Sequence, residues 1–440
     1  MRRQRRWVVL GVLLTLALGP AAEAAEPPTG PAAPVLTATP VSGSTAPVPT
    51  TAGLRSAALP ALRPSTMKAR GVVVLDPASG DELLAVGADR PLVPASTLKL
   101  LTTTAALAVL GPQARIDTRV LADDPTAEVV TLTLVGGGDA TLTRERTGPW
   151  ASLADLATQV ADAVPVGDVV VQYDASAFIG PALGPGWPAT FPRAGIVAPV
   201  TALMVDEGRV SPGATARVAN PARQAAGAFA ALLRDRGLNV KVVRKGAAAA
   251  EASTVGTVSS PPIATLVQRT LTESDNDLAE ALGHLVGGKR LQQPSFAGGA
   301  KAVSEVVTEL GLPVDGLRLV DGSGLSGQDR VTARTIAAAL SRAAAGSDAA
   351  ASIINAGLAV AGFTGTLADR FTKPGTRDAD GVVRGKTGTL TGVSALAGTV
   401  RTADGRVLAF AVLGNKVGSA TKARGALDGF AARLAECGCR

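Results

Sequence analysis

The stretch PASTLKLLT, residues 94–102, carries the feature on which the fold assignment depends: Ser96 stands three positions before Lys99, at the start of an apolar segment. Two interpretations of this S-x-x-K pattern are open. Serine is favoured at helix N-caps, where its hydroxyl accepts from backbone N–H groups and the lysine faces water. Alternatively, positions i and i+3 of a helix share one face, which makes Ser96 a nucleophile beside Lys99 as its base.

The S-x-x-K pattern occurs three times in the chain, and the local context separates the copies. The first follows Pro64 and is soon interrupted by a glycine, and the third lies in a stretch of small residues after the last predicted strand. Only the copy at Ser96 follows a predicted β-hairpin, 71–77 and 82–90, and opens a long apolar helix that we predict to end near Leu110. The copies are Ser65 with Lys68, Ser96 with Lys99, and Ser419 with Lys422.

Two further motifs occur once each. Residues 274–276, SDN, are the only S-x-N sequence, and residues 386–388, KTG, are the only K-T-G sequence. Each has an ordinary explanation, because the first can begin a helix and the second can end a strand in a turn. The order S-x-x-K, S-x-N, K-T-G, however, is that of penicillin-binding proteins and class A β-lactamases. The 178 residues from Ser96 to Ser274 leave room for an inserted domain, and Lys386 follows 112 residues later.

Five more segments carry a resemblance to one family. Together with the three motifs they are typical of the low-molecular-mass class C, or S13, penicillin-binding proteins, and they are absent from class A β-lactamases. From about Leu54 to near its C-terminus, the sequence resembles this D-alanyl-D-alanine carboxypeptidase/endopeptidase family. The segments are GGGDATL (136–142), YDASAF (173–178), GIVAPVTAL (195–203), VDGSGLS (320–326) and TGTLADRF (364–371).

The resemblance implies a mixed α/β (α+β) fold. A penicillin-binding, β-lactamase-like serine transpeptidase domain has an antiparallel sheet flanked by helices, and here a large α/β domain is inserted into it. We expect residues 54–115 and 261–440 to form the peptidase domain and residues 116–260 to form the insert. Ahead of them we expect a signal peptide, 1–24, and a disordered Pro/Thr/Ala-rich linker, 25–53.

The C-terminal part of the chain predicts a meander of strands covered by a helix. Segments 382–390, 393–402 and 406–415 are strand-like, with a turn at 403–405. A final helix places Leu427, Phe430 and Leu434 on one face, which can cover one side of the sheet.

The N-terminus predicts export. Four arginines precede an apolar run from Trp7 to Leu18, and Ala22-Glu23-Ala24 fits a signal-peptide cleavage site. The run is shorter than the roughly 20 residues that span a bilayer, and an uncleaved leader that anchors the protein stays an alternative. Removing residues 1–24 takes away four Arg and one Glu, which lowers the net charge from +7 to +4. Such a charge fits an anionic cell envelope and gives no reason to expect a nucleic-acid partner.

The composition restricts the kinds of site. Hydrophobic residues make up 46% of the chain and aromatic residues only 3%, so the core must consist mainly of Ala, Val and Leu. His284 is the only histidine, which argues against a zinc site of several His and Cys ligands; we interpret it as structural and expect neither a metal nor a cofactor. For Cys437 and Cys439 a disulfide, pairing between chains, free thiols and a tail without a role all stay open.

The resemblance also implies roles for the motif residues. A serine hydroxyl is a poor nucleophile at its free pKa. Lys99 can act as its base if the amine is neutral, and burial and a second cation, Lys386, would both lower the pKa of Lys99. Backbone N–H groups of Ser96 and Thr389 are implied as the oxyanion hole. The catalytic residues are Ser96, Lys99 and Ser274, which relays a proton to the leaving amine; the substrate-binding residues are Asn276, Lys386, Thr387, Gly388 and Thr389.

Asp139, within GGGDATL, has two interpretations. Aspartate often stabilises a glycine-rich turn through its own backbone. Alternatively, its carboxylate contacts an amino group on the stem peptide of the substrate.

These features predict a serine-type D-Ala-D-Ala carboxypeptidase, with DD-endopeptidase action left open. It would act on peptidoglycan stem peptides ending in D-Ala-D-Ala, and β-lactams would acylate Ser96. Two alternatives are a β-lactamase and a non-catalytic wall-binding protein. The E-x-x-x-N pattern with which class A enzymes activate the deacylating water is absent between Ser96 and Lys386, and the intact motifs argue against a binding protein without activity.

Overall fold

The computed structural model describes residues 45–439. The predicted signal peptide and residues 25–44 of the predicted linker lie outside the described residues. Helix α1 (Thr51–Ala57) begins before Leu54, inside the stretch that the sequence predicted as a disordered linker. Thr50 caps this helix, since its hydroxyl accepts from Gly53 N at 3.1 Å. Thr50 N also donates to the carbonyl oxygen of Cys439 at 2.7 Å, so the start and the end of the fold are tied together.

The C-terminal tail is part of this junction. Cys437 is buried and forms a disulfide with Cys439. Of the alternatives left open by the sequence, the structure therefore has the intramolecular pair.

A six-stranded antiparallel sheet, in the order β2-β1-β11-β10-β9-β8, forms the larger part of the fold. The predicted hairpin and the predicted meander both belong to this sheet, and Thr402 and Arg406 close the predicted turn between β10 and β11. The strands are β2 (Glu82–Val86), β1 (Met67–Leu75), β11 (Val407–Val417), β10 (Val393–Arg401), β9 (Val383–Leu390) and β8 (Ala359–Val360).

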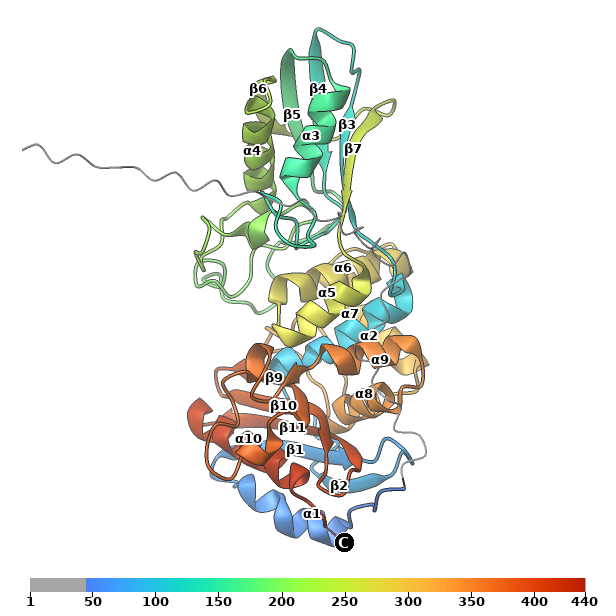
Figure 1. Cartoon of the computed structure of the whole chain (residues 1–440), viewed down its shortest axis with the longest axis vertical. Helices are drawn as coiled ribbons and strands as arrows, with labels where there is room; N and C mark the ends of the chain where they lie inside the picture. The colour runs from blue at the N-terminus through green and yellow to red at the C-terminus, as the bar shows by residue number, and fades with distance from the viewer. Residues whose placement is uncertain (1–44, 440) are drawn as a thin grey trace, which may run out of the picture. The chain divides into compact units, whose positions relative to one another are not determined.

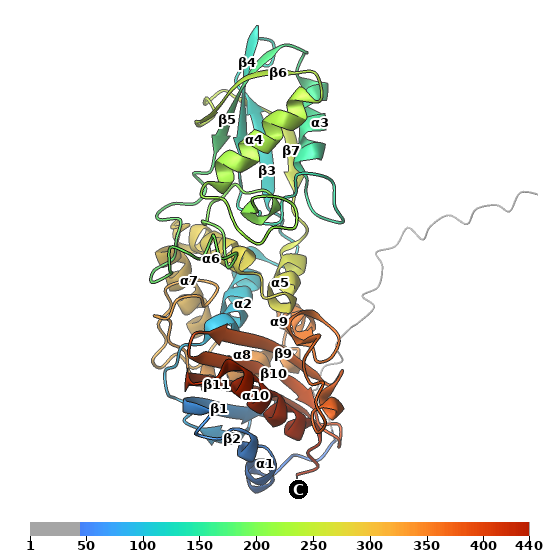
Figure 2. The ribbon, with the colours of Figure 1, turned by 90° about the vertical axis from the view of Figure 1, so that its left-hand side faces the viewer.

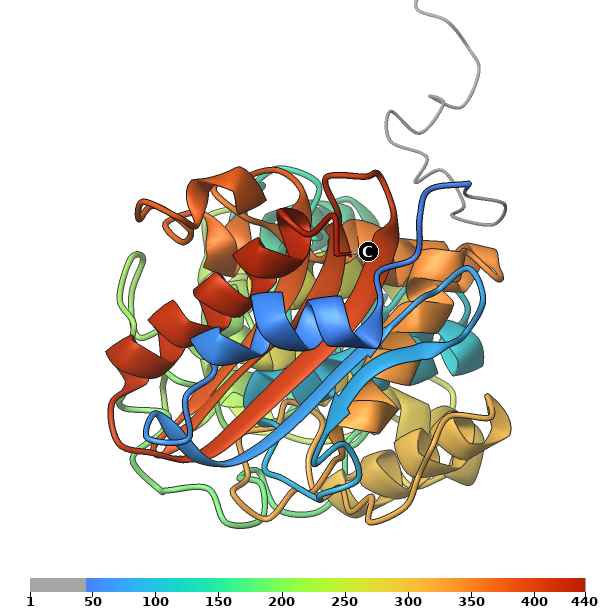
Figure 3. The same ribbon diagram turned by 90° about the horizontal axis from the view of Figure 1, so that it is seen from below.

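Helices cover both faces of this sheet (Figure 1). Successive side chains of a strand point to opposite faces, so in β11 Ala409 and Ala411 pack towards α2 and α8, whereas Phe410 and Val412 pack towards α10. Figure 3 shows α10 and α1 across one face, and the predicted face of the final helix, with Leu427, is buried there. The helices of this part are α2 (Lys99–Leu110), α5 (Ile263–Thr272), α6 (Asn276–Leu291), α7 (Phe296–Glu309), α8 (Ala333–Ala345), α9 (Ala349–Gly357) and α10 (Ala420–Ala435).

A second sheet of five strands, in the order β6-β5-β4-β3-β7, is built from residues between α2 and α5. It is mixed, since β4, β5 and β6 are parallel and β3 pairs antiparallel with both neighbours. Helices α3 (Leu153–Ala163) and α4 (Pro221–Arg234) lie on one face (Figure 2) and share a separate apolar core with it. The strands are β3 (Asp117–Ala122), β4 (Val129–Val135), β5 (Asp168–Asp174), β6 (Asn239–Lys245) and β7 (Ser253–Ser259).

Among residues 45–439, no helix is both long enough and apolar enough to cross a bilayer.

Candidate active site

Ser96 lies in a 3₁₀ turn, Ala95–Leu98, immediately before α2. The sequence predicted an α-helix from Ser96, but the α-helical ladder begins at Lys99. The turn begins at Ala95, which has φ of 49°, an uncommon conformation for a residue with a Cβ. In a 3₁₀ turn side chains at i and i+3 eclipse, which aligns Ser96 with Lys99.

Lys99 is fully buried and its ammonium nitrogen has three oxygen partners. Nζ lies 2.9 Å from Ser96 Oγ, 2.7 Å from Asn276 Oδ1 and 2.8 Å from the carbonyl oxygen of Ser323. Burial lowers the pKa of Lys99 to about 8, and nearby carboxylates, first Glu280, oppose the shift. A substantial fraction of neutral amine is therefore available at mildly alkaline pH to accept the proton of Ser96.

Lys386 and Ser274 form the second pair of the site. Lys386 Nζ donates to Ser274 Oγ at 2.8 Å and to the carbonyl oxygen of Thr387 at 3.0 Å. Burial, and then the charge of Lys99, hold the pKa of Lys386 well below its usual value. Ser274 has φ of 61°, so the loop before α6 holds it in a conformation that side chains rarely adopt.

Asn276 is the first residue of α6, whose N-cap is Asp275. Its Nδ2 donates to the carbonyl oxygen of Ile196 at 2.8 Å, so its Oδ1 faces Lys99. Ile196 is held in turn because Asp277 Oδ1 accepts from Ala198 N at 2.7 Å. The amide of Asn276 is thus oriented by a segment located between β5 and α4.

Strand β9 brings the K-T-G motif against the turn that carries Ser96. A Cβ built on Gly388 would lie 2.8 Å from the carbonyl oxygen of Pro94 and 3.2 Å from Ala95 Cβ. Only glycine allows this approach. Ser96 and Thr387 are half-buried and Thr389 is exposed, whereas Lys99 and Lys386 are fully buried.

Asp139 supports both of its interpretations. Its Oδ1 accepts from Thr141 N at 2.8 Å and from Thr141 Oγ1 at 2.6 Å, which is the turn-stabilising arrangement. Its Oδ2 is buried and has no hydrogen-bond partner within residues 45–439. Burial raises the pKa of Asp139, against the hydrogen bonds from Thr141 and the charge of Arg269. Oδ1 thus stabilises the turn, whereas Oδ2 has no partner among the described residues.

His284 takes no part in this site. It is buried, its Nδ1 lies 2.9 Å from the carbonyl oxygen of Glu280, and its ring packs against Phe178 and Phe296. Burial lowers its pKa to about 4, so a neutral structural histidine is present, in agreement with the interpretation from sequence. Ser419, from the third S-x-x-K copy, is the ordinary N-cap of α10.

Sequence reasoning missed the support behind Lys99. Buried carboxylates, Glu280 on α6 and Asp321 within the loop itself, bind the backbone of the loop 320–326. Asp321 accepts from Gly324 N, Ser326 N and the indole N–H of Trp187. The only signal was that VDGSGLS is typical of the family, and that signal assigned no role to any of its residues.

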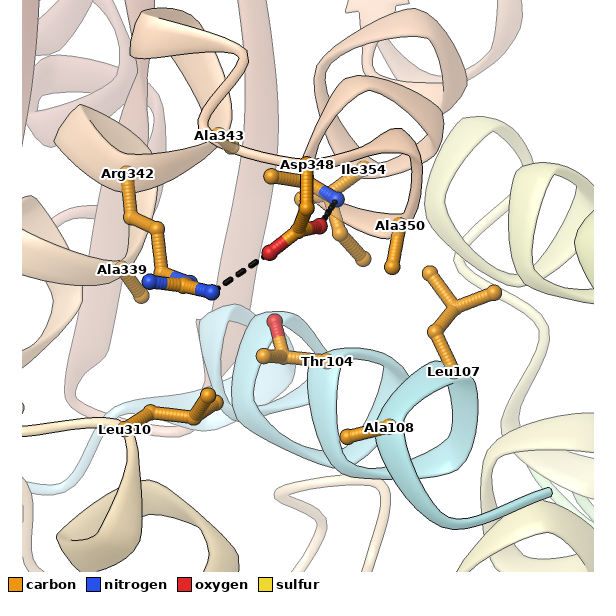
Figure 4. A pocket seen from close by; sticks show the side chains of 11 residues that line it. Thr104, Leu107, Ala108, Leu310, Ala339, Arg342, Ala343, Asp348, Ala350 and Ile354 are labelled. Carbon is orange, nitrogen blue, oxygen red and sulfur yellow. Dashed lines mark hydrogen bonds and ion pairs between the residues drawn. The ribbon is translucent and has the colours of Figure 1, made fainter. Parts of the chain in front are cut away.

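A small cavity of about 40 Å³ lies farther along α2, away from its N-terminus (Figure 4). Thr104, Leu107 and Ala108 of α2 line it together with residues of α8 and α9, and the ion pair between Arg342 and Asp348 borders it. None of the motif residues lines it, so we attribute it to imperfect helix packing.

Several known proteins are similar to this chain in sequence or in structure. A carboxypeptidase of Mycobacterium tuberculosis is 38% identical over 393 residues, which cover 87% of this chain and 83% of that protein. A D-alanyl-D-alanine carboxypeptidase of Actinomadura sp. is 32% identical over 453 residues, with 83% and 81% covered. The crystal structure of penicillin binding protein 4 from Haemophilus influenzae matches with a TM-score of 0.73 at 21% identity, covering 87% of this chain and 98% of that one.

The last comparison establishes the fold: the predicted mixed α/β architecture of penicillin-binding proteins is confirmed. A model of the D-Ala-D-Ala carboxypeptidase 3 (S13) family matches residues 57–216 and 212–434, which is most of the chain. This chain therefore belongs to the D-Ala-D-Ala carboxypeptidase 3 (S13) family.

Proposed function

We propose that this chain is a serine-type D-Ala-D-Ala carboxypeptidase that acts on peptidoglycan stem peptides through an acyl-enzyme on Ser96. The observation that carries the proposal is the position of the buried Lys99 Nζ, 2.9 Å from Ser96 Oγ. A base within hydrogen-bond reach of a serine hydroxyl is the geometry of an activated nucleophile.

In the acylation step, Ser96 Oγ attacks the carbonyl carbon of the penultimate D-Ala while neutral Lys99 accepts the hydroxyl proton. Backbone N–H groups of Ser96 and Thr389 stabilise the oxyanion. The C–N bond breaks, Ser274 relays to the leaving nitrogen the proton that Lys99 took from Ser96, and D-Ala departs. Water then hydrolyses the ester and restores Ser96.

The substrate is held at its carboxylate end and at its backbone amide. Lys386, Thr387 and Thr389 bind the terminal carboxylate, and Gly388 lets their strand approach Ser96. An arriving carboxylate favours the ammonium form of Lys386, because an opposite charge raises a lysine pKa. Asn276 binds the substrate amide.

Asp139 contacts an amino group on the stem peptide. The support for this assignment is its buried Oδ2, which has no partner within the described residues, since such an atom is costly unless a ligand supplies a donor.

β-Lactams acylate the same serine, because they resemble the D-Ala-D-Ala end. The support is that penicillin binding protein 4 of Haemophilus influenzae, which shares this fold, has also been solved in complex with a β-lactam. Cleavage of cross-links is the same reaction with a longer leaving group. The protein acts outside the cytoplasm, exported by residues 1–24, and remains peripheral to the membrane or cell wall.

The test is the intact mass of the protein after incubation with benzylpenicillin, beside a Ser96→Ala variant and with D-Ala release measured from a D-Ala-D-Ala peptide. We expect one stable adduct on the native chain, none on the variant, and D-Ala release only by the native chain. Rapid loss of penicillin without an adduct would indicate a β-lactamase. Neither an adduct nor hydrolysis would indicate a binding protein without activity.

A further inference from the structure

Glu280 is a buried carboxylate to which the chemistry above gives no role. It lies on α6, one turn after Asn276, and is fully inaccessible to solvent. Its Oε1 accepts from Ser323 N at 2.8 Å and its Oε2 from Gly322 N at 3.0 Å. Both oxygens accept from successive backbone N–H groups of one loop, so Glu280 fixes the position of the loop.

The same loop is anchored to α2 from the other side. Thr102 Oγ1 donates to the carbonyl oxygen of Gly322 at 2.7 Å, and Lys99 Nζ donates to the carbonyl oxygen of Ser323 at 2.8 Å. Glu280 therefore determines where the Ser323 carbonyl lies relative to Lys99.

This carbonyl selects the orientation of the amine. A neutral lysine has two N–H donors and one lone pair. Two of the three oxygens around Lys99 Nζ, Asn276 Oδ1 and Ser323 O, can only accept. When both N–H groups are directed to them, the lone pair points at Ser96 Oγ, whose hydroxyl can donate. The two acceptors aim the base at the nucleophile.

We propose that Glu280 is a positioning residue for acyl transfer: by binding the backbone of Gly322 and Ser323 it holds the carbonyl that aims Lys99 at Ser96. The proposal rests on the acyl-enzyme function proposed above and adds a residue to its machinery that contacts no substrate.

The charge of Glu280 gives the proposal a second readout. Of the carboxylates that raise the pKa of Lys99, Glu280 has the largest effect, followed by Asp321, Asp275 and Asp277, while the charge of Lys99 lowers the pKa of the second cation, Lys386. Burial, and then the charge of Asp321, raise the pKa of Glu280 itself to about 8, so its charge acts on Lys99 mainly in the upper part of the pH range. Replacing Glu280 by an uncharged residue removes this charge, and the pKa of Lys99 falls further. The acid limb, which is the part of the pH profile where the acylation rate rises with pH, then moves to lower pH, and the maximal rate falls.

The experiment measures the rate constant of acylation by benzylpenicillin, from time courses of intact mass between pH 6 and 10. A rate constant is used because an unfolded fraction lowers only the amplitude. For Glu280→Gln we expect a maximal rate about tenfold to a hundredfold below native, as for a misplaced catalytic group, with the acid limb displaced to lower pH. Thr102→Val removes the other anchor of the loop without changing a charge, so it lowers the rate and leaves the acid limb in place.

Asp329→Asn is the matched control. Asp329 is equally buried and holds the same loop, through Val320 N at 2.8 Å, yet it binds neither Gly322 nor Ser323; we expect a rate within about twofold of native. Glu280→Gln at the native rate, or an equal loss in Asp329→Asn, would overturn the proposal. If Glu280→Gln does not fold, Thr102→Val decides, and an unchanged rate there overturns the proposal too. Absence of acylation in the native chain would instead refute the proposed function itself.

Discussion

The side-chain amide of Asn276 donates from Nδ2 to the carbonyl oxygen of Ile196 at 2.8 Å. This bond crosses from the start of α6 to a segment that precedes α4, and it leaves Asn276 Oδ1 2.7 Å from Lys99 Nζ. The residues between β5 and α4 therefore contribute to the orientation of a group beside the base, although none of them belongs to the three motifs.

Asn276→Asp tests this orientation. The variant keeps an acceptor for Lys99 but sets a carboxylate oxygen against the Ile196 carbonyl, and its negative charge raises the pKa of Lys99. We expect slower acylation and an acid limb displaced to higher pH, opposite in sign to Glu280→Gln. The measurement is the benzylpenicillin acylation rate against pH, and a limb that stays in place or moves to lower pH would contradict the interpretation.

Native acylation is expected to rise with pH through about 8. Burial lowers the pKa of Lys99 to about 8, and only the amine form, which predominates above that pH, can accept the Ser96 proton. Lys99→Arg removes the base because arginine stays protonated, so the rate should fall by about 10²- to 10⁴-fold. Lys68→Arg, in the first S-x-x-K copy, is the control and should react at the native rate. A native rate that is flat between pH 6 and 9 would argue against Lys99 as the base.

Gly388 should not tolerate a side chain. A Cβ there would lie 2.8 Å from the carbonyl oxygen of Pro94, so Gly388→Ala must push β9 away from the turn that carries Ser96. We expect acylation at least about tenfold slower, since catalytic groups lose their alignment. Gly425→Ala, on α10, is the control, because no atom lies within 4 Å of its added Cβ. Equal rates for both variants would show that the close approach is not needed.

The sequence predicted which residues come together better than it predicted the local backbone geometry. The three motifs were unique or distinguishable by context, and the structure brings Ser96, Lys99, Ser274, Asn276 and Lys386 together. The sequence did not predict the 3₁₀ turn at Ser96, because local propensity gives no sign of the positive φ of Ala95. The boundaries proposed for the inserted domain stay a prediction.

Glu280 could not have been found from the sequence alone. Its partners Gly322 and Ser323 lie 42 and 43 positions further along the chain, and no periodicity connects them. From the sequence of its helix alone, Glu280 would be expected to face water like most charged residues. Only the arrangement of α6 against the loop 320–326 shows that it is buried and that both of its oxygens accept backbone N–H groups.

Asp329 should make the stability of the protein depend on pH. Burial, then the charge of Asp321, raises the pKa of Asp329 to about 9. A carboxyl whose folded pKa is raised contributes stability that is complete below its unfolded pKa, about 4, and is lost as pH rises through about 9. Asparagine binds no proton, so Asp329→Asn should gain thermal stability relative to native as pH rises from 5 to 9. Melting temperatures at pH 5, 7 and 9 check this, with exposed Asp315→Asn as control; a difference that does not change with pH would contradict it.

Asp139 should distinguish substrates by whether they carry an amino group. Its Oδ1 is occupied by Thr141, whereas its buried Oδ2 has no partner within the described residues. Asp139→Asn keeps an oxygen for the Thr141 bonds and removes the charge. For a stem peptide with a free amine we expect kcat/KM to fall about tenfold to a hundredfold, the loss of a charge-assisted hydrogen bond of about 1.5–3 kcal/mol. For a short acylated peptide that lacks the amine, kcat/KM should change little.

Thr141→Val is the matched control: it weakens the turn but keeps the carboxylate, so any loss should be equal for both substrates. If Asp139→Asn lowers kcat/KM equally for the two peptides, Asp139 serves only the turn.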